Sequence, residues 1–266
     1  MRVGIVARPD LPGGVKLARI LLKVLSKEDV VLEKKLAAKL RKRGVSIGAM
    51  RVDAIVTIGG DGTVLFAHRQ LPDVPILGIN MGGTGFLADV APADAVKAIR
   101  KMTTGQLPMK GRERLATKAA GERLPDALNE VVISSATMGK SLAFKVLVDG
   151  DAAMRTQGDG VVIATPTGST AYALAAGGPV IDPRLDVFAI VPVCATHPRV
   201  SPLVVPMTSK IKIELTRPDR RAFVFVDGQR VTEVGSNDEI LLYRSEKLAK
   251  FFKWHGEFYQ KVREKL

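Results

Sequence analysis

The chain has 266 residues, and 46% of them are hydrophobic, which excludes global disorder and allows one large domain or two smaller ones. A formal charge of +13 predicts anionic partners such as nucleotides, nucleic acid or anionic lipid, but an aromatic content of 5% weakens a stacking platform for nucleic acid. Cys194 is the single cysteine, and no apolar run approaches the roughly 18 residues of a membrane span, so we expect a soluble cytoplasmic protein without a nucleic-acid or membrane partner.

Strands and helices alternate through residues 1–108, and each strand is apolar on both faces, as in a parallel sheet. We therefore predict a Rossmann-like α/β domain with a parallel sheet there. The expected strands are "RVGIVA", "DAIVTI" and "VPILGI". The expected helices cover residues 17–25, 30–43, 63–71 and 92–102, and Gly44 is expected to stop the second one.

The pattern changes after residue 108. Short strands, separated by turn pairs such as Asp149-Gly150 and Asp227-Gly228, predict an antiparallel β-rich sandwich domain over residues 109–242. The tail, residues 243–266, ends in "KLAKFFKWHGEFYQKVREKL", which has apolar and aromatic residues at helical intervals. We expect this tail to pack back on the first domain.

The stretch "GGDGT", residues 59–63, places an acid inside a glycine loop between a predicted strand and a predicted helix. Glycines let backbone N–H groups approach a phosphate, but no Walker lysine follows. At about 4 Å and an effective dielectric near 20, Asp61 and a phosphate would repel by roughly 4 kcal/mol. Three explanations stay open: a bound Mg²⁺ offsets the charge, Asp61 accepts the proton of an attacking hydroxyl, or Asp61 is a helix N-cap.

A second glycine loop, with Gly82, Gly83 and Gly85, follows the next strand. Because the carboxyl ends of neighbouring parallel strands meet at one sheet edge, both loops are expected to line one crevice. The alternative is two unrelated tight turns.

The stretch "GDGVVIATPTGSTAYALAAGGPV", residues 158–180, runs from a strand into a helix start. Ser169 and Thr170 are expected to cap that helix and to offer hydroxyls to a polar ligand. Tyr172 adds an aromatic face, and Asp159 precedes the strand. The alternative is a capped helix with a buried tyrosine.

Asn129 and Glu130 stand side by side at a strand start. Their amide and carboxylate groups suit vicinal ribose hydroxyls, which both donate and accept hydrogen bonds. A loop asparagine beside an exposed glutamate is the alternative.

These stretches together resemble the NAD kinase family. The matching segments, in chain order, are "GGDGT", "GINMGGTGFL", "LNEVVI", "GDGVVIATPTGSTAYALAAGGPV" and "VDGQ". The resemblance implies transfer of the ATP γ-phosphate to the 2′-hydroxyl of the adenosine ribose of NAD, with Mg²⁺ or another divalent cation. It also implies an α/β domain followed by a β-rich domain, assembled as a homodimer or homotetramer whose pocket is partly completed by a neighbour.

The resemblance assigns a role to each matching residue. Asp61 matches the catalytic acid, the base for the ribose hydroxyl. The phosphate- and ATP-binding positions are Gly59, Gly60, Gly62 and Thr63. The NAD-binding positions are Phe86, Asn129, Glu130, Asp159, Thr170, Ala171, Tyr172 and Asp227. No residue is assigned as a metal ligand.

Two departures and two alternatives accompany this interpretation. Ala175 stands where the family often has serine, and residues 192–202 match the family pattern only roughly, so His197 is given no catalytic role. A lipid kinase of the diacylglycerol type that shares the "GGDGT" loop is one alternative. A non-catalytic, basic nucleotide- or nucleic-acid-binding protein is the other. The donor (ATP, another triphosphate or polyphosphate) and the use of NADH stay open.

Overall fold

A computed structural model describes residues 1–8, 10–11, 13–83, 85–254 and 258–266. The chain divides into two compact units. The first comprises Met1–Arg112 and Ala249–Leu266, and the second comprises Glu113–Leu248.

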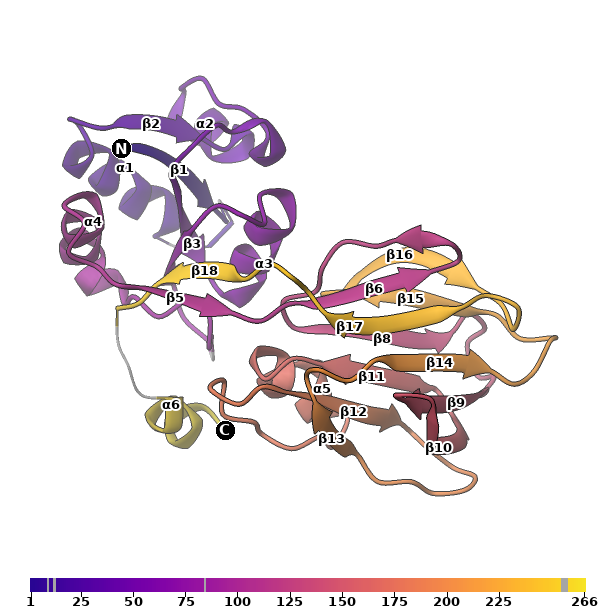
Figure 1. Cartoon of the computed structure of the whole chain (residues 1–266). Coiled ribbons are helices and arrows are strands. Elements are labelled where there is room, and N and C mark those ends of the chain that lie inside the picture. The colour runs from indigo at the N-terminus through magenta and orange to yellow at the C-terminus, as the bar shows by residue number, and fades with distance from the viewer. Residues whose placement is uncertain (9, 12, 84, 255–257) are drawn as a thin grey trace. The chain divides into compact units, whose positions relative to one another are not determined.

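The first unit contains a six-stranded sheet of order β2-β1-β3-β4-β18-β5 (Figure 1). The strands from β2 to β18 are parallel, and β5 runs antiparallel to β18. The strands are β1 (Arg2–Ala7), β2 (Asp29–Leu32), β3 (Ala54–Gly59), β4 (Ile76–Asn80), β5 (Met109–Arg112) and β18 (Ala249–Phe252). The helices are α1 (Gly14–Val24), α2 (Lys34–Leu40), η1 (Ile47–Ala49), α3 (Asp61–Gln70), η2 (Pro92–Asp94), α4 (Ala95–Thr103) and α6 (Phe258–Lys265).

Alternate strand residues of this sheet pack against different helices. Val3 and Ile5 of β1 belong to one apolar cluster with buried residues of α1, α2 and α4. On the other face, a Cβ placed on Gly78 of β4 would lie 3.3 Å from Val64 Cγ2 of α3. The sheet is therefore buried on both faces, which explains why its strands lack polar alternation.

The second unit consists of two antiparallel sheets with an apolar core. One sheet has the order β10-β9-β14-β17-β6-β7 and the other the order β13-β12-β11-β8-β15-β16. The first sheet contains β6 (Leu115–Ala119), β7 (Glu122–Arg123), β9 (Leu142–Val148), β10 (Asp151–Gly158), β14 (Ile211–Leu215) and β17 (Ile240–Arg244). The second contains β8 (Glu130–Ser135), β11 (Gly160–Ala164), β12 (Val187–Val193), β13 (Leu203–Pro206), β15 (Ala222–Val226) and β16 (Gln229–Val234).

Two short helical segments, η3 (Thr167–Thr170) and α5 (Tyr172–Ala175), follow β11. Ala173 of α5 packs with Val162, Ala164 and Val191 in a cluster separate from the main core. The predicted fold class, an α/β domain with a parallel sheet followed by a β-rich sandwich, is confirmed.

The prediction of a continuous helix over residues 30–43 is wrong. Val30 and Val31 belong to β2, where they pair with Val3 and Gly4 of β1. The helix starts only after Glu33, whose carboxylate accepts hydrogen bonds from the N–H groups of Lys35 and Leu36. A short apolar run is compatible with both helical and strand periodicity. Here the parallel pairing with β1 makes it a strand.

The predicted stop of that helix is also wrong in its residue. Arg41 takes the left-handed conformation that ends α2, with φ of 55°. Gly44 is required for a different reason, because a Cβ there would lie 2.4 Å from Ala37 Cβ. Close approach, rather than helix termination, explains this glycine.

The helical expectation for residues 247–266 holds only at the end of the tail. Phe251 lies in strand β18, where it pairs with Ile76 of β4 and Lys110 of β5, and α6 begins at Phe258. Residues 255–257 of that expectation lie outside the described residues. Aromatic spacing alone did not reveal that the sheet has an open edge beside β4.

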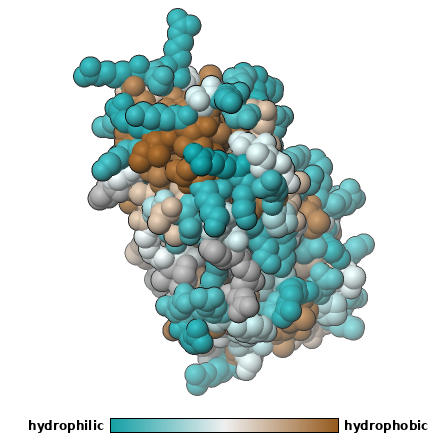
Figure 2. All heavy atoms as spheres, turned by 90° about the vertical axis from the view of Figure 1, so that its left-hand side faces the viewer, coloured by the Kyte–Doolittle hydropathy of each residue, from teal (hydrophilic) through white to brown (hydrophobic). Residues whose placement is uncertain are grey.

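In Figure 2 hydrophilic side chains cover most of the visible face, and a large hydrophobic area near the top and smaller ones near the lower end lie between them. Lys and Arg together number 40 against 27 Asp and Glu, and this excess of positive charge favours anionic partners. None of the helices in the described ranges has the length and hydropathy of a membrane-spanning segment.

Candidate functional site

The glycine loop joins the end of β3 to the start of α3. Gly59 is buried, and a Cβ at this position would lie 2.1 Å from Thr63 Oγ1, so only glycine fits. Gly60 and Gly62 face open space: no described atom lies within 4 Å of a Cβ built there. The loop therefore brings backbone close to whatever occupies that space.

Asp61 does not cap α3. Gly60 is the N-cap residue, and no side-chain cap hydrogen bond is formed there by the described residues. The Asp61 carboxylate instead accepts three backbone hydrogen bonds, from Phe86 N at 2.6 Å, Leu87 N at 3.0 Å and Ala88 N at 3.0 Å. The N-cap explanation of this acid is thus excluded, and the two glycine loops are tied together through it.

The second glycine loop, residues 82–85, also contains a position where only glycine fits without a shift of its neighbours. A Cβ at Gly85 would lie 2.6 Å from Asp61 Oδ1, so any larger residue would displace the carboxylate or the loop. The loops also meet through the backbone, where Met81 N donates to the Gly59 carbonyl oxygen at 2.9 Å. The prediction that both loops lie at neighbouring carboxyl strand ends is confirmed, since Gly59 of β3 pairs with Asn80 of β4.

Helix α6 supports the same loop. The ring centroids of Phe86 and Phe258 are 6.2 Å apart, and Lys261 Nζ donates to the Phe86 carbonyl oxygen at 3.2 Å. Lys261 Nζ also lies 4.0 Å from Asp89 Oδ2. Phe86 is therefore held by Asp61 through its N–H and by the C-terminal helix through its ring and carbonyl.

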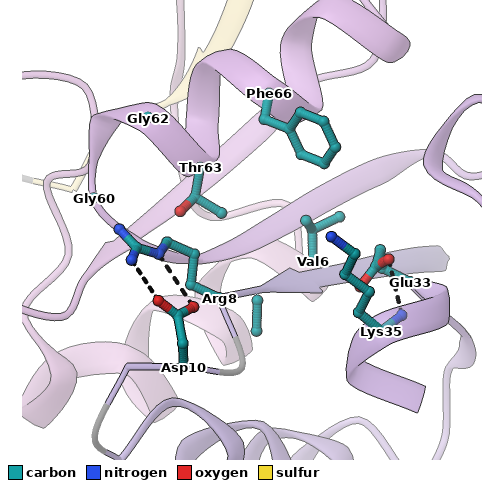
Figure 3. Close-up of a pocket in the computed structure, with 10 residues that line it drawn as sticks. Val6, Arg8, Asp10, Glu33, Lys35, Gly60, Gly62, Thr63 and Phe66 are labelled. Carbon is teal, nitrogen blue, oxygen red and sulfur yellow. Dashed lines mark hydrogen bonds and ion pairs between the residues drawn. The ribbon is translucent and has the colours of Figure 1, made fainter. Parts of the chain in front are cut away.

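A cavity of about 460 Å³ opens beside the glycine loop (Figure 3). Ten residues line it: Val6, Ala7, Arg8, Asp10, Glu33, Lys35, Gly60, Gly62, Thr63 and Phe66. The Arg8 guanidinium pairs with Asp10, and this pairing holds the pKa of the Asp10 carboxyl below its usual range. Thr63 Oγ1 is buried and has no hydrogen-bond partner among the described residues.

In the second unit, Asp227 anchors the Asn129–Glu130 pair. Its carboxylate accepts hydrogen bonds from Leu128 N at 2.9 Å, Asn129 N at 2.8 Å and Glu130 N at 3.2 Å. In return, Asp227 N donates to the Glu130 carbonyl oxygen at 3.0 Å. Asp227 reaches this position in a turn between β15 and β16, with φ of 46°.

Residues 165–168, Thr-Pro-Thr-Gly, also contact the backbone around Asn129. Thr165 N donates to the Asn129 carbonyl oxygen at 2.9 Å, and the Thr165 hydroxyl donates to the Leu128 carbonyl oxygen at 2.6 Å. A Cβ on Gly168 would lie 2.0 Å from the Asn129 carbonyl oxygen, so this glycine is needed for the close approach. The backbone of Asn129 is therefore enclosed by two segments distant in the sequence.

The side chains of the pair keep unused acceptors. Asn129 is 7% exposed and Glu130 is 6% exposed, and neither Asn129 Oδ1 nor Glu130 Oε2 has a hydrogen-bond partner among the described residues. Burial, and secondarily the charge of Asp227, raise the pKa of Glu130 to about 8, while the Tyr172 N–H acts in the opposite direction. Buried unpaired acceptors are uncommon and indicate a ligand that donates hydrogen bonds.

Tyr172, Ala171 and Thr170 follow in η3 and α5, and the Tyr172 ring is exposed. The prediction that Ser169 and Thr170 cap a helix is wrong. Ser169 Oγ accepts a hydrogen bond from Ile181 N at 2.7 Å, and the Thr170 hydroxyl donates to the Thr167 carbonyl oxygen at 3.3 Å. The Ser169 hydroxyl is therefore engaged with the backbone of Ile181, 12 residues further along the chain.

Asp159 is not brought to the Asn129–Glu130 pair. It precedes β11, whose far end, Ala164, pairs with Glu130. Five residues of strand rise separate these ends, roughly 17 Å. Asp159 is exposed and lies beside Cys194, whose thiol pKa it raises by hydrogen bonding and charge.

Several lining residues of the cavity were missed from the sequence. Phe66 follows Thr63 by three positions on α3 and so shares its face, a signal that helical spacing carries. Arg8 directly follows β1, at the carboxyl edge where parallel sheets bind ligands. Glu33 and Lys35 at the start of α2 were obscured because a helix was expected from residue 30.

Family models match both parts of the chain. The ATP-NAD kinase N-terminal domain matches residues 3–107, and the ATP-NAD kinase C-terminal domain matches residues 128–254. The two-domain fold and the glycine loop are thus those of a nucleotide-dependent phosphotransferase.

Relatives and solved structures agree with these matches. The chain is 40% identical to the NAD kinase of Methanothermobacter thermautotrophicus, covering 100% of this chain and 96% of the relative. An NAD kinase from Archaeoglobus fulgidus, solved in complex with ATP, has a TM-score of 0.79 and 29% identity, with 99% of each chain covered. Yeast NADH kinase, complexed with NADH, has a TM-score of 0.90 at 22% identity, covering 99% of this chain and 86% of the yeast chain, and shows the shared fold.

The chain belongs to the ATP-NAD kinase family, whose members are phosphotransferases. The predicted family is confirmed, and nothing in these matches supports the lipid kinase alternative.

Proposed function

We propose that this chain transfers the γ-phosphate of ATP to the 2′-hydroxyl of the adenosine ribose of NAD and so forms NADP. One observation carries the acceptor half of this proposal. Asn129 Oδ1 and Glu130 Oε2, at the entry to β8, are two buried oxygens that have no hydrogen-bond partner among the described residues. A ribose carries vicinal hydroxyls that donate hydrogen bonds, and leaving such acceptors unpaired costs about 1–3 kcal/mol each. NAD kinase relatives that cover the whole chain support the identity of the sugar.

The remaining NAD contacts are inferred from the family pattern. Phe86, held between Asp61 and α6, is proposed to line the dinucleotide pocket. Thr170, Ala171 and Tyr172 are proposed to contact the dinucleotide, since the Tyr172 N–H interacts with the Glu130 carboxylate. The proposed role of Asp227 is indirect, because its carboxylate holds the backbone of the ribose-binding pair.

Asp61 is proposed as the base for the ribose hydroxyl. A carboxylate offers about four acceptor positions, and three of those of Asp61 are occupied by backbone N–H groups. Of these three bonds only the one from Phe86 N reaches Oδ2, so we propose that this oxygen receives the ribose hydroxyl. A hydroxyl placed there would transfer its proton to Asp61 as it attacks phosphorus, a step that contributes typically 10²–10⁴-fold to the rate.

The glycine loop is proposed to hold the donor phosphates. The N–H groups at the start of α3 and the open space around Gly60 and Gly62 favour an anion there. Mg²⁺ is proposed to arrive with the triphosphate and to neutralise its charge. Within the described ranges, no three His, Cys, Asp or Glu side chains gather as a metal site. Magnesium is commonly held by substrate phosphates with one or two carboxylates, so the residues present fit that mode.

A homodimer or homotetramer is proposed from the position of Asp159. Its strand separates it from the ribose-binding pair of the same chain by roughly 17 Å, which supports a contact to the dinucleotide from a neighbouring copy. Mixing an Asp159→Asn chain with a Glu130→Gln chain tests this idea, because mixed oligomers should regain activity that neither variant has alone.

The central test measures NADP formed from NAD, ATP and Mg²⁺ by the wild type and by Asp61→Asn. We expect the variant to lose at least two orders of magnitude in kcat, because an amide cannot take the hydroxyl proton. Asp53→Asn is the matched control, since Asp53 also accepts a backbone hydrogen bond, from Arg2 N, away from the loop. Circular dichroism must show that all proteins are folded. Unchanged turnover in Asp61→Asn contradicts the proposed role, and absence of NADP from the wild type contradicts the function.

A further inference from the structure

The cavity beside the glycine loop has two chemically different ends. Its volume of about 460 Å³ lies within the range of small-molecule sites, which is about 300–1,000 Å³. Gly60, Gly62 and Thr63 line one end, and Phe66, Val6 and Lys35 line the other (Figure 3). The family pattern assigns the first three positions to phosphate and leaves the other end without a ligand.

The glycine end suits a chain of phosphates. Helix α3 is ten residues long, and its N-terminal N–H groups carry partial positive charge. Thr63 is 4% exposed, and its hydroxyl lines the cavity without a hydrogen-bond partner among the described residues. In Figure 3 this hydroxyl points toward the side of the cavity where Arg8 lies. A phosphate oxygen there satisfies the hydroxyl.

Arg8 adds the cation that the glycine loop lacks. It directly follows β1, and its backbone N–H donates to the Ile58 carbonyl oxygen at 3.1 Å, which holds it beside the strand that leads into the loop. Its guanidinium pairs with Asp10, an exposed carboxylate of single charge. A triphosphate carries more charge and matches the fork of the guanidinium bidentately, so it competes well for Arg8.

The other end suits a flat, partly apolar group. Phe66 lies one turn after Thr63 on α3, lines the cavity and is 55% exposed, so its ring is accessible to a ligand. In Figure 3 its ring lies over the space above Val6, and the side chain of Lys35 reaches toward the same space. An extended inorganic polyphosphate gains nothing from an aromatic face, because it has no surface to stack.

We propose that this end is a nucleobase subsite, in which Phe66 stacks on the base of a nucleoside triphosphate while Arg8 contacts its phosphates. The subsite makes the chain select a nucleoside triphosphate over an inorganic polyphosphate as donor. This inference rests on the proposed function, because it extends the site that delivers the phosphoryl group.

Calorimetric titration of the full chain with two probes tests the subsite. The probes are Mg²⁺·ATP and Mg²⁺·tripolyphosphate, both without NAD. We expect the wild type to bind ATP more tightly than tripolyphosphate. Phe66→Ala is expected to weaken ATP about fivefold or more, since base–aromatic stacking is lost, and to leave tripolyphosphate within twofold. Phe66→Tyr keeps the ring and should retain ATP affinity.

Two further variants complete the design. Arg8→Ala is expected to weaken both probes severalfold, because both carry phosphates. Gln70→Ala changes an exposed residue farther along α3 that does not line the cavity, and both affinities should stay at wild-type values. In steady-state assays, Phe66→Ala should raise KM for ATP and leave KM for NAD unchanged.

The outcomes separate this inference from the proposed function. Equal ATP affinities in wild type and Phe66→Ala, or equal losses for both probes, overturn the subsite even where NADP is formed normally. If Phe66→Ala binds ATP more weakly but binds tripolyphosphate as the wild type does, the subsite is supported even where no NADP is formed. In that case only the assignment of NAD as acceptor is contradicted.

Discussion

Asp61 in the first unit and Asp227 in the second each accept three backbone hydrogen bonds from a segment distant in the sequence. Asp61 holds Phe86, Leu87 and Ala88. Asp227 holds the residues 128–130 across 97 to 99 positions of chain. In both units a carboxylate thus fixes the loop or strand start that carries a proposed NAD contact.

The surroundings of the two acids differ. Asp61 stands in the first turn of a helix between Gly60 and Gly62, where the space is open. Asp227 stands in a hairpin turn against the buried Glu130, whose ionisation it opposes. A carboxylate that anchors backbone N–H groups is therefore not, by that fact alone, a reacting group. The open space around Gly60 and Gly62 is what distinguishes the surroundings of Asp61 from those of Asp227.

The largest expected effect comes from Gly168→Ala. The added Cβ would lie 2.0 Å from the Asn129 carbonyl oxygen, and this clash is with backbone that Asp227 also holds. We expect a loss of more than about 4 kcal/mol in the free energy of unfolding, an exceptional value that marks a broken close approach.

Urea denaturation measures this loss. Gly235→Ala is the matched control in the same unit, because its nearest neighbour would lie at an ordinary 3.7 Å, and it should change stability by less than about 1 kcal/mol. A Gly168→Ala protein of wild-type stability would show that the Asn129 backbone moves freely, against the anchoring described for Asp227.

Asp227→Asn should destabilise the protein by about 3 kcal/mol, because the amide accepts fewer of the three N–H groups and presents its own donors to them. Asp61→Asn removes an equivalent anchor, so a similar loss is expected there. Their kinetics should differ. Asp227→Asn should mainly raise KM for NAD, whereas Asp61→Asn should mainly lower kcat. Equal changes of kcat and KM in Asp61→Asn and Asp227→Asn would contradict the proposal that Asp61 acts as a base and Asp227 only as an anchor.

Glu130→Gln tests whether burial and the nearby charge of Asp227 raise the pKa of Glu130. The pKa of Glu130 is about 8 in the folded chain against 4.5 as its ordinary value, so between these values the folded state binds one more proton than the unfolded state. The contribution of Glu130 to stability is therefore fully present below pH 4.5 and is lost as pH rises toward 8. Between pH 5 and 7 the loss from this one group is on the order of 2–3 kcal/mol.

The measurement is the free energy of unfolding of the unliganded protein across this pH range. Glutamine cannot ionise, so the part of the slope that Glu130 contributes should be missing in Glu130→Gln. Glu113→Gln is a suitable control, because Glu113 is paired with Arg244 at the surface of the same unit. The same slope in wild type and Glu130→Gln would assign it to another group.

Much of the fold was predictable because its signals are local. The apolar strands of the first unit and the turn pairs of the second lie within a few residues of the elements that they define. Predictions failed where the deciding partner is remote. Val30 and Val31 join β1 as a strand, and Phe251 joins β4, although both segments have helical spacing.

The candidate site shows the same division. Its glycine loops and its Asn-Glu pair were candidates from their spacing, each with a structural alternative left open, and only the family resemblance assigned their roles. The hydrogen bonds of Asp61 and Asp227, and the cavity lining by Arg8, Lys35 and Phe66, were not predicted. They join residues from separate elements, and no short pattern encodes which of them meet.

The fold class, the family and the types of side chain available for chemistry can be inferred from the sequence alone, because glycine spacing and hydrophobic periodicity act over a few residues. Three properties emerge from the three-dimensional fold: Asp61 holds a loop instead of capping its helix, Glu130 is buried with Oε2 unpaired among the described residues, and Phe66 borders a cavity. Burial and hydrogen-bond pairing depend on segments far apart in the chain, such as Leu128 and Asp227, 99 residues apart, or Phe86 and Lys261, 175 residues apart. These properties exist only once the sheets have assembled.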